Sequence, residues 1–234
     1  MTSPEELVEA IRSLARVAHA VDSSPEGRER AVSQIESARA ALADGPPRQR
    51  WYDVDAVPSA ATRASNRELS TFSGKLNPIA PPMLIRSGEL ADGRPALIGS
   101  VRLDRLREGP PHSAHGGVLA GLFDELLGGG QRLNGGPPGM TGRLTVRYRR
   151  PTPLDADLEL RVWIHDERRR RVTVRGECVL AGDGDGDGDG EAELVTAEAE
   201  AIFLRVDFER LSDMMRSRAD GETPSPAPPR SRDD

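Results

Sequence analysis

The sequence contains a single cysteine, Cys178, so no disulfide bond can form within the chain. This usage is typical of a protein in a reducing compartment. Aromatic residues make up only 3% of the 234 residues, too few for the stacking surfaces of proteins that bind single-stranded nucleic acid. The formal net charge of -6 also argues against a basic surface for phosphate backbones. We therefore predict a cytoplasmic protein that does not bind nucleic acid.

Long apolar runs are also missing. No stretch approaches the roughly 20 consecutive apolar residues that cross a bilayer. The acidic residues 1–6 lack the basic start and apolar run of a signal peptide. The histidines show no metal-ligand spacing with cysteine or acidic residues, and neither a G-x-S-x-G nor a P-loop motif occurs. We expect no membrane span and no metal site.

Residues 182–190 form a run of Gly-Asp repeats that raises the question of a calcium loop. An EF-hand loop starting at Asp183 or Asp185 requires glutamate at its twelfth position, where this chain has Leu194 or Thr196. The glycine-rich calcium nonapeptide requires an apolar residue in each repeat, and the run has none. The composition therefore favours a flexible acidic tip between two strands.

Residues 1–45 predict a helical hairpin, because apolar residues recur at helical spacing in two stretches. Ser24 followed by Pro25 is typical of the start of the second helix. The two predicted apolar faces consist of Leu7, Ile11, Leu14, Ala18 and Val21 in the first helix and of Ala31, Ile35, Ala38 and Leu42 in the second. We expect this appendage to serve in packing or oligomer contact.

Two further stretches predict irregular structure. Residues 46–82 are polar and rich in proline and glycine, which is typical of a binding loop, a lid or a linker. Asn77 is the candidate binding residue of this connecting segment. Residues 211–234 are polar and proline-rich and predict a disordered tail.

Residues 83–210 predict the main domain, with one helix over residues 115–131. Alternating apolar residues predict six strands, at residues 83–90, 95–103, 140–149, 158–165, 172–180 and 194–206. Successive strands without intervening helices favour an antiparallel sheet. We therefore predict an α+β domain in which a sheet of five to six mostly antiparallel strands wraps around one long central helix.

The predicted central helix has few polar residues, so we expect most of it to be buried. Ala120 and Gly121 are small enough for the sheet backbone to approach closely. Asp124 is the acidic residue within this apolar pattern, and a buried carboxylate is costly unless it has a partner or a function.

The start of this helix is a candidate site for a carbonyl or oxyanion. The first backbone N–H groups of a helix lack intrahelical partners, and Gly116 and Gly117 would let a ligand oxygen approach them. Asp124 lies two turns beyond Gly117 on the same face, about 10 Å away. That distance is too long for both to grip one carbonyl in a single subunit, but a symmetric dimer can bring them together at one site.

Several other residues near this helix each allow a functional and a purely structural interpretation. His115 is either a base or, more commonly, a helix cap. Glu125 leaves the helix about 100° from Asp124 and is a secondary binding candidate. Thr141 either orients a carboxylate or water, or is an ordinary strand hydroxyl. The basic residues that would contact phosphates, or be solvated strand ends, are Arg147, Arg149, Arg150 and residues 168–171.

Two stretches taken together resemble the hotdog-fold acyl-CoA thioesterases of the phenylacetate (PaaI) type. Residues 115–124 read His-Gly-Gly-Val-Leu-Ala-Gly-Leu-Phe-Asp, which matches the family's His-Gly-Gly helix start with an acid two turns later. Residues 140–154 match its strand that opens with threonine, here Thr141, and ends in Arg-Pro-x-Pro-Leu. The resemblance covers about residues 75–210.

The resemblance implies hydrolysis of acyl-CoA thioesters, with coenzyme A as part of the substrate and no separate cofactor. It implies that Asp124 is the general base or nucleophile, that the Gly117 N–H polarises the thioester carbonyl and that Thr141 positions water. It also implies a homodimer, often paired into a tetramer, with active sites between subunits. The alternative is a non-catalytic acyl-CoA-binding module. A hydratase on the same fold is disfavoured, since the expected Asp/His pair is missing.

Overall fold

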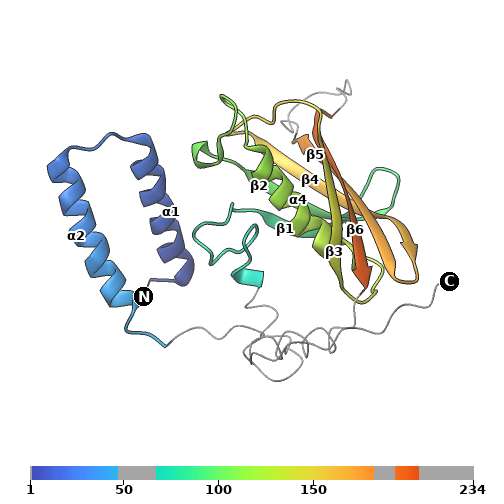
Figure 1. Ribbon diagram of the computed structural model, residues 1–234, viewed down its shortest axis with the longest axis horizontal. Coiled ribbons are helices and arrows are strands. Elements are labelled where there is room, and N and C mark those ends of the chain that lie inside the picture. The colour runs from blue at the N-terminus through green and yellow to red at the C-terminus, as the bar shows by residue number, and fades with distance from the viewer. Residues whose placement is uncertain (1, 47–66, 182–192, 206–234) are drawn as a thin grey trace, which may run out of the picture.

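The computed structural model describes residues 2–46, 67–181 and 193–205 (Figure 1). Two N-terminal helices, α1 (Pro4–Ala20) and α2 (Pro25–Leu42), precede a domain with one long helix, α4 (Gly116–Gly130), and a short 3-10 helix, η2 (Arg105–Arg107). The Gly-Asp run and the predicted disordered tail lie outside the described residues, so those two predictions stay predictions. No helix in the described part of the chain is long and apolar enough to cross a membrane.

The sheet has six strands, all antiparallel, in the order β1-β2-β4-β5-β6-β3. This arrangement around a single helix confirms the predicted α+β hotdog fold. β1 and β3 form the two edges of the sheet, so each has one side that pairs with no other strand among the described residues. The strands are β1 (Leu84–Glu89), β2 (Pro95–Arg102), β3 (Gly139–Tyr148), β4 (Asp157–Arg168), β5 (Arg171–Leu180) and β6 (Val195–Arg205).

The turn between β1 and β2 follows from its residues. Gly93 has a φ of 81°, a left-handed conformation that glycine adopts without steric cost. Asp92 accepts a hydrogen bond from the Arg94 backbone N–H at 3.1 Å, and Leu90 donates to the Arg94 carbonyl at 2.9 Å. These bonds close the hairpin predicted from the sequence.

The core lies between α4 and the face of the sheet that curves around it (Figure 1). Close packing depends on glycine in the sheet as well as in the helix. A Cβ added at Gly176 would lie 2.6 Å from Val162 Cγ1 and 2.9 Å from the Arg161 carbonyl. The helix buries Leu119, Leu122, Phe123, Leu126, Leu127 and Gly130.

The expectation that Asp124 is buried is wrong for a single protomer. The buried residues of α4 lie on the side that faces the sheet, and Asp124 and Gly117 lie on an exposed side that this sheet does not reach. The expected reason for the small residues in the helix is also wrong at Gly121, because this glycine contacts the ring of Phe72 from the connecting segment rather than the sheet backbone.

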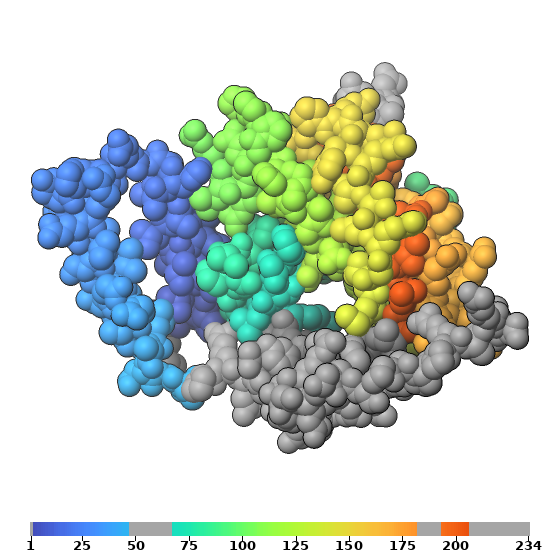
Figure 2. Space-filling model, in the orientation of Figure 1, coloured from blue at the N-terminus to red at the C-terminus, as the bar shows by residue number. Residues whose placement is uncertain are grey.

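The two N-terminal helices form as predicted and are joined by residues 21–24, but they pack little against each other. Ser3 and Glu6 make a capping box at the start of α1, and the Ser24 hydroxyl accepts from the Gly27 N–H at 3.1 Å. The two helices make almost no contact with each other, and Figure 2 shows open space between them. α1 buries only Val8 and α2 buries no residue, so their predicted apolar faces are exposed within one protomer.

Candidate active site

His115 caps the start of α4. Its backbone is extended, and its side-chain Nδ1 accepts a hydrogen bond from the Gly117 N–H at 2.9 Å. Its carbonyl accepts from Val118 and Leu119 at 2.9 and 3.2 Å. The cap requires a neutral imidazole with its proton on Nε2, because a protonated Nδ1 has no lone pair to accept with. Of the two readings of His115, the structure shows the cap.

This cap changes which N–H group at the helix start is free. The Gly117 N–H, the donor implied for the thioester carbonyl, is already bonded to His115. The Gly116 N–H has no acceptor within the described part of the chain. The Gly116 carbonyl is held by the Tyr148 hydroxyl of β3, which donates to it at 2.7 Å. In the arrangement seen here, Gly116 therefore offers the available donor.

Asp124 and Thr141 form a hydrogen-bonded pair at the exposed face of α4. The Thr141 hydroxyl, near the start of β3, donates to Asp124 Oδ1 at 3.1 Å. Asp124 is exposed and makes no other side-chain hydrogen bond within the described residues, so its second oxygen is free to accept a proton or attack an electrophile. β3 has an irregular register between Thr141 and Arg143, which locally re-aims the strand. The arrangement is that of an oriented carboxylate open to solvent.

Glu125 is engaged within the chain. Its Oε1 accepts hydrogen bonds from the hydroxyls of Ser70 and Ser73, each at 2.5 Å. Both serines belong to the connecting segment, more than 50 residues earlier in the chain. Sequence patterns did not predict these contacts, because two serines in a polar stretch carry no signal of a specific partner.

Asn77 also bonds to its own segment. Its Nδ2 donates to the carbonyls of Leu69 and Ser70 at 3.3 and 3.1 Å, and its Oδ1 accepts from the Ile79 N–H at 3.2 Å. Its own carbonyl accepts from Arg12 of α1 at 3.0 Å. These hydrogen bonds stabilise the fold of the connecting segment, and the Asn77 side chain forms its hydrogen bonds with backbone groups of that segment.

The basic candidates are not brought together into one cluster. Arg149 and Arg150 both donate their backbone N–H groups to Thr196 at the start of β6, whereas Arg171 lies opposite Leu204 near its end. That separation along a strand is roughly 25 Å. Arg149 is exposed and paired with Glu198 at 2.7 Å, and the exposed Arg150 donates to the Val195 carbonyl at 3.3 Å.

The described residues show neither a metal-type cluster nor a reactive thiol. No three His, Cys, Asp or Glu side chains among them are grouped as a metal site requires. Cys178 is completely buried in the core, and burial raises the pKa of its thiol to about 11, so it is not a nucleophile at neutral pH.

Comparisons with known proteins agree with this fold. Residues 112–186 match the family model of the thioesterase superfamily. The chain is similar to the crystal structure of protein RHA08564, a thioesterase superfamily protein, with 27% identity and a TM-score of 0.69 over 87% of this chain and 91% of that one. A search of curated proteins finds no match.

Weaker similarities cover about half of the chain. Thioesterase superfamily member 2 from Mus musculus is 13% identical over 53% of this chain and 88% of that one, with a TM-score of 0.43. The PaaI protein from the phenylacetic acid degradation operon of E. coli is 15% identical over 53% and 82% of the two chains, with a TM-score of 0.42. The family match, which contains α4 and Asp124, and the similarity to RHA08564 agree that this chain is similar to thioesterase superfamily proteins.

Proposed function

We propose that this protein hydrolyses acyl-CoA thioesters, with Asp124 as the catalytic residue. The observation that carries the proposal is the hydrogen bond from Thr141 to Asp124 on the exposed face of α4. It leaves a solvent-accessible carboxylate with one oxygen held and one oxygen free, on the helix whose N-terminus carries His115, Gly116 and Gly117. The match to the thioesterase superfamily includes these residues.

Two mechanisms use the free oxygen of Asp124. As a general base, it takes a proton from water while the water oxygen attacks the thioester carbonyl. The tetrahedral intermediate then collapses, the C–S bond breaks and the coenzyme A thiolate leaves. As a nucleophile, Asp124 attacks the carbonyl itself, the C–S bond breaks and the coenzyme A thiolate leaves, and water then hydrolyses the resulting anhydride. In both mechanisms the Thr141 hydroxyl orients the carboxylate.

The helix N-terminus stabilises the negative charge that develops on the carbonyl oxygen. The Gly116 N–H is available for this role as the helix stands. The Gly117 N–H joins it when the exposed His115 side chain rotates away from its cap position. This proposal keeps the expected oxyanion site at the glycine pair and adds His115 as the group that controls one of its donors.

The site requires a second subunit. Within one chain, Gly117 and Asp124 are two helical turns apart, about 10 Å, so a single carbonyl does not reach both. The edge strand β3 exposes Met140 and Tyr148 by about half of their surface and leaves one side unpaired. We infer a cytoplasmic homodimer or dimer of dimers in which the helix start of one protomer faces Asp124 of the other, with Arg149 and Arg150 near the phosphates of coenzyme A.

The experiment compares wild type with Asp124→Asn on a panel of acyl-CoA thioesters. The amide keeps the shape of the side chain but neither accepts a proton usefully nor attacks a carbonyl, so kcat should fall by about 10² or more. Glu125→Gln is the control on the same helix, because glutamine keeps an oxygen that can accept from both serines. Light scattering at assay concentration should show a dimer or larger.

Each contrary result is informative. Wild type that binds acyl-CoA tightly in calorimetry and releases no free thiol would favour the binding module over the enzyme. Hydrolysis by Asp124→Asn at the wild-type rate would place the catalytic group elsewhere. A monomer that is fully active would exclude a site shared between two subunits.

A further inference from the structure

The connecting segment has a role that the sequence left open. Residues 67–80 lie between α1 and α4, as Figures 1 and 2 show. Side chains of this segment contact α4 on one side and α1 on the other. The segment is therefore fastened to both elements, although it contains almost no regular structure of its own.

Phe72 fits against α4 at Gly121. A Cβ added at Gly121 would lie 2.1 Å from Cζ and 2.3 Å from Cε1 of the Phe72 ring, far inside any real contact. Only glycine at this position lets the ring lie against the helix backbone. The contact is three residues before Asp124, so the ring lies within one helical turn of the proposed catalytic carboxylate.

Glu125 holds the same segment one turn further along the helix. Two hydroxyls, from Ser70 and Ser73, donate to one of its oxygens and flank Phe72 in the sequence. Hydrogen bonds to an ionised acceptor are roughly twice as strong as those between neutral groups. Glu125 therefore fixes the backbone on both sides of Phe72 and determines where its ring lies.

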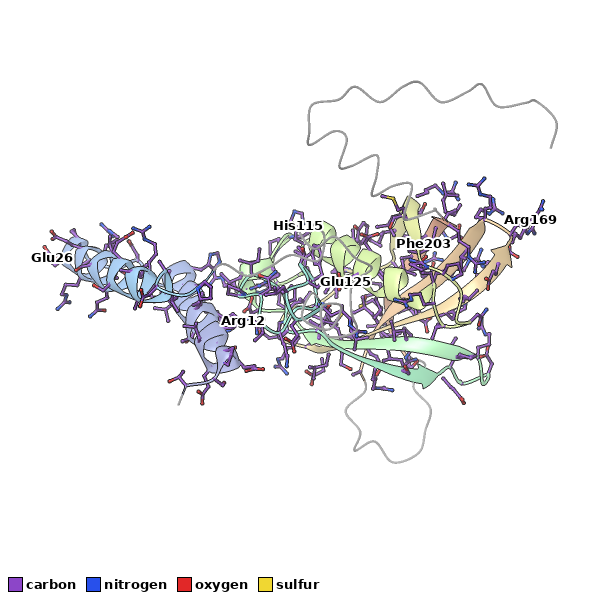
Figure 3. The ribbon with its side chains drawn as sticks, turned by 90° about the horizontal axis from the view of Figure 1, so that it is seen from below. Arg12, Glu26, His115, Glu125, Arg169 and Phe203 are labelled. Carbon is purple, nitrogen blue, oxygen red and sulfur yellow. The ribbon has the colours of Figure 1, made fainter. Side chains whose placement is uncertain are left out.

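α1 holds the outer side of the segment. Arg12 donates to the carbonyls of Asn77 and Gly74 at 3.0 and 3.5 Å, and Lys75 is paired with Glu5 at 3.2 Å. Figure 3 shows Arg12 on α1 and Glu125 on α4, on the two sides of this segment. α1 therefore holds the segment on the side opposite α4, which gives this N-terminal helix a role at the site.

The positions of these contacts around α4 place Phe72 and Tyr148 on opposite sides of one strip of the helix surface. At 100° per residue, Gly117 and Asp124 lie within about 20° of each other on the helix surface. Gly121, with Phe72 against it, lies about 40° from Gly117 to one side, whereas Gly116, bonded to Tyr148, lies about 100° to the other. Phe72 and Tyr148 therefore flank opposite sides of the line that joins the helix start to Asp124.

We propose that residues 67–80 form one wall of the acyl-binding site and that Phe72, held in place by Glu125, sets the size of the acyl group that the site accepts. This proposal rests on the proposed thioesterase function. Glu125 acts as a positioning residue, since it reaches the substrate only through Phe72 and the two serines.

The test measures kcat/KM over a series of straight-chain acyl-CoA substrates of increasing length. Phe72→Ala removes the ring, and Gly121→Ala displaces it while leaving it in the chain. Both should raise the kcat/KM for the longest acyl groups relative to the shortest by about tenfold or more, the scale on which a pocket discriminates added methylenes. Two variants are used because the displaced ring in Gly121→Ala can also lower the folding stability.

Gly128→Ala is the matched control on the same helix. A Cβ at Gly128 meets nothing within 4 Å, so this variant should keep the wild-type chain-length profile. A second comparison separates positioning from simple structural support. Glu125→Gln keeps an acceptor oxygen for both serines and should retain the wild-type profile, whereas Glu125→Ala should shift it in the same direction as Phe72→Ala.

The outcomes distinguish this proposal from the function on which it rests. If wild type hydrolyses no member of the series, the proposed function fails and the wall's role in selecting acyl groups fails with it. A second outcome is that wild type is active while Phe72→Ala lowers kcat/KM by the same factor for every chain length, or leaves it unchanged. That result would support thioester hydrolysis and refute the role of residues 67–80 in selecting the acyl group. A profile of Glu125→Ala identical to wild type would refute Glu125 as the residue that positions Phe72.

Discussion

Thr141→Ala tests whether the hydrogen bond between β3 and α4 orients the catalytic carboxylate. The substitution removes the hydroxyl that donates to Asp124 Oδ1 at 3.1 Å and leaves the backbone pairing of β3 with β6 in place. Asp124 would then rotate freely between its staggered side-chain conformations. Substrate should still bind, because the change removes no group that we place against coenzyme A or the acyl chain.

The magnitude follows from the kind of bond that is lost. A hydrogen bond to a charged group contributes about 1.5–3 kcal/mol, and the exposure of Asp124 favours the lower end of that range. Since every 1.4 kcal/mol corresponds to a factor of ten, kcat should fall about tenfold, well short of the factor of 10² or more expected for Asp124→Asn. Thr141→Ser keeps the hydroxyl and should recover most of the lost rate.

Steady-state hydrolysis of one good acyl-CoA substrate, followed by release of free thiol, gives kcat and KM for each variant. The decisive comparison is the double variant Asp124→Asn with Thr141→Ala. If Thr141 acts only through Asp124, the double variant should be no slower than Asp124→Asn alone. A further tenfold loss in the double variant would show that Thr141 acts on water or substrate directly and would refute the orienting role.

Two further predictions concern stability and reactivity. His115→Ala removes the cap of α4 and should lower the free energy of unfolding by about 0.5–2 kcal/mol, as measured by urea denaturation. His115→Asn should lose much less, because asparagine is a strong capping residue. Equal denaturation midpoints for the alanine variant and wild type would show that the cap contributes nothing. Cys178 should react with a thiol reagent at pH 8 only after unfolding, because the native thiol is buried and its pKa is raised to about 11. Since the unfolded thiol loses its proton near pH 8.5 and the folded one near 11, the free energy of unfolding should fall between these pH values, and Cys178→Ala should remove that part of the fall; rapid labelling of the native protein would contradict the buried thiol.

Local patterns in the sequence were sufficient for the secondary structure and for the antiparallel character of the sheet, but not for the order of its strands. Each predicted strand appears within a few residues of its expected bounds, because alternating apolar residues bury one face whatever the partner strand is. The helix predicted over residues 115–131 is α4, and the predicted cap at Ser24 is present, since both depend on neighbours in the chain. The motif from His115 to Asp124 also indicated the resemblance to thioesterases, and the family match over residues 112–186 agrees with it.

The exposure of Asp124 and the partners of Glu125 were decided only by the tertiary structure. Asp124 is exposed because the sheet covers only one side of α4, and the small number of polar residues in this helix had suggested burial on all sides. Ser70 and Ser73 meet Glu125 across more than 50 residues, and such a pairing has no local signature. The reason for glycine at position 121 is a phenylalanine ring from a segment without regular structure. These features depend on contacts distant in sequence, whereas the sequence by itself determined the features that arise between neighbours.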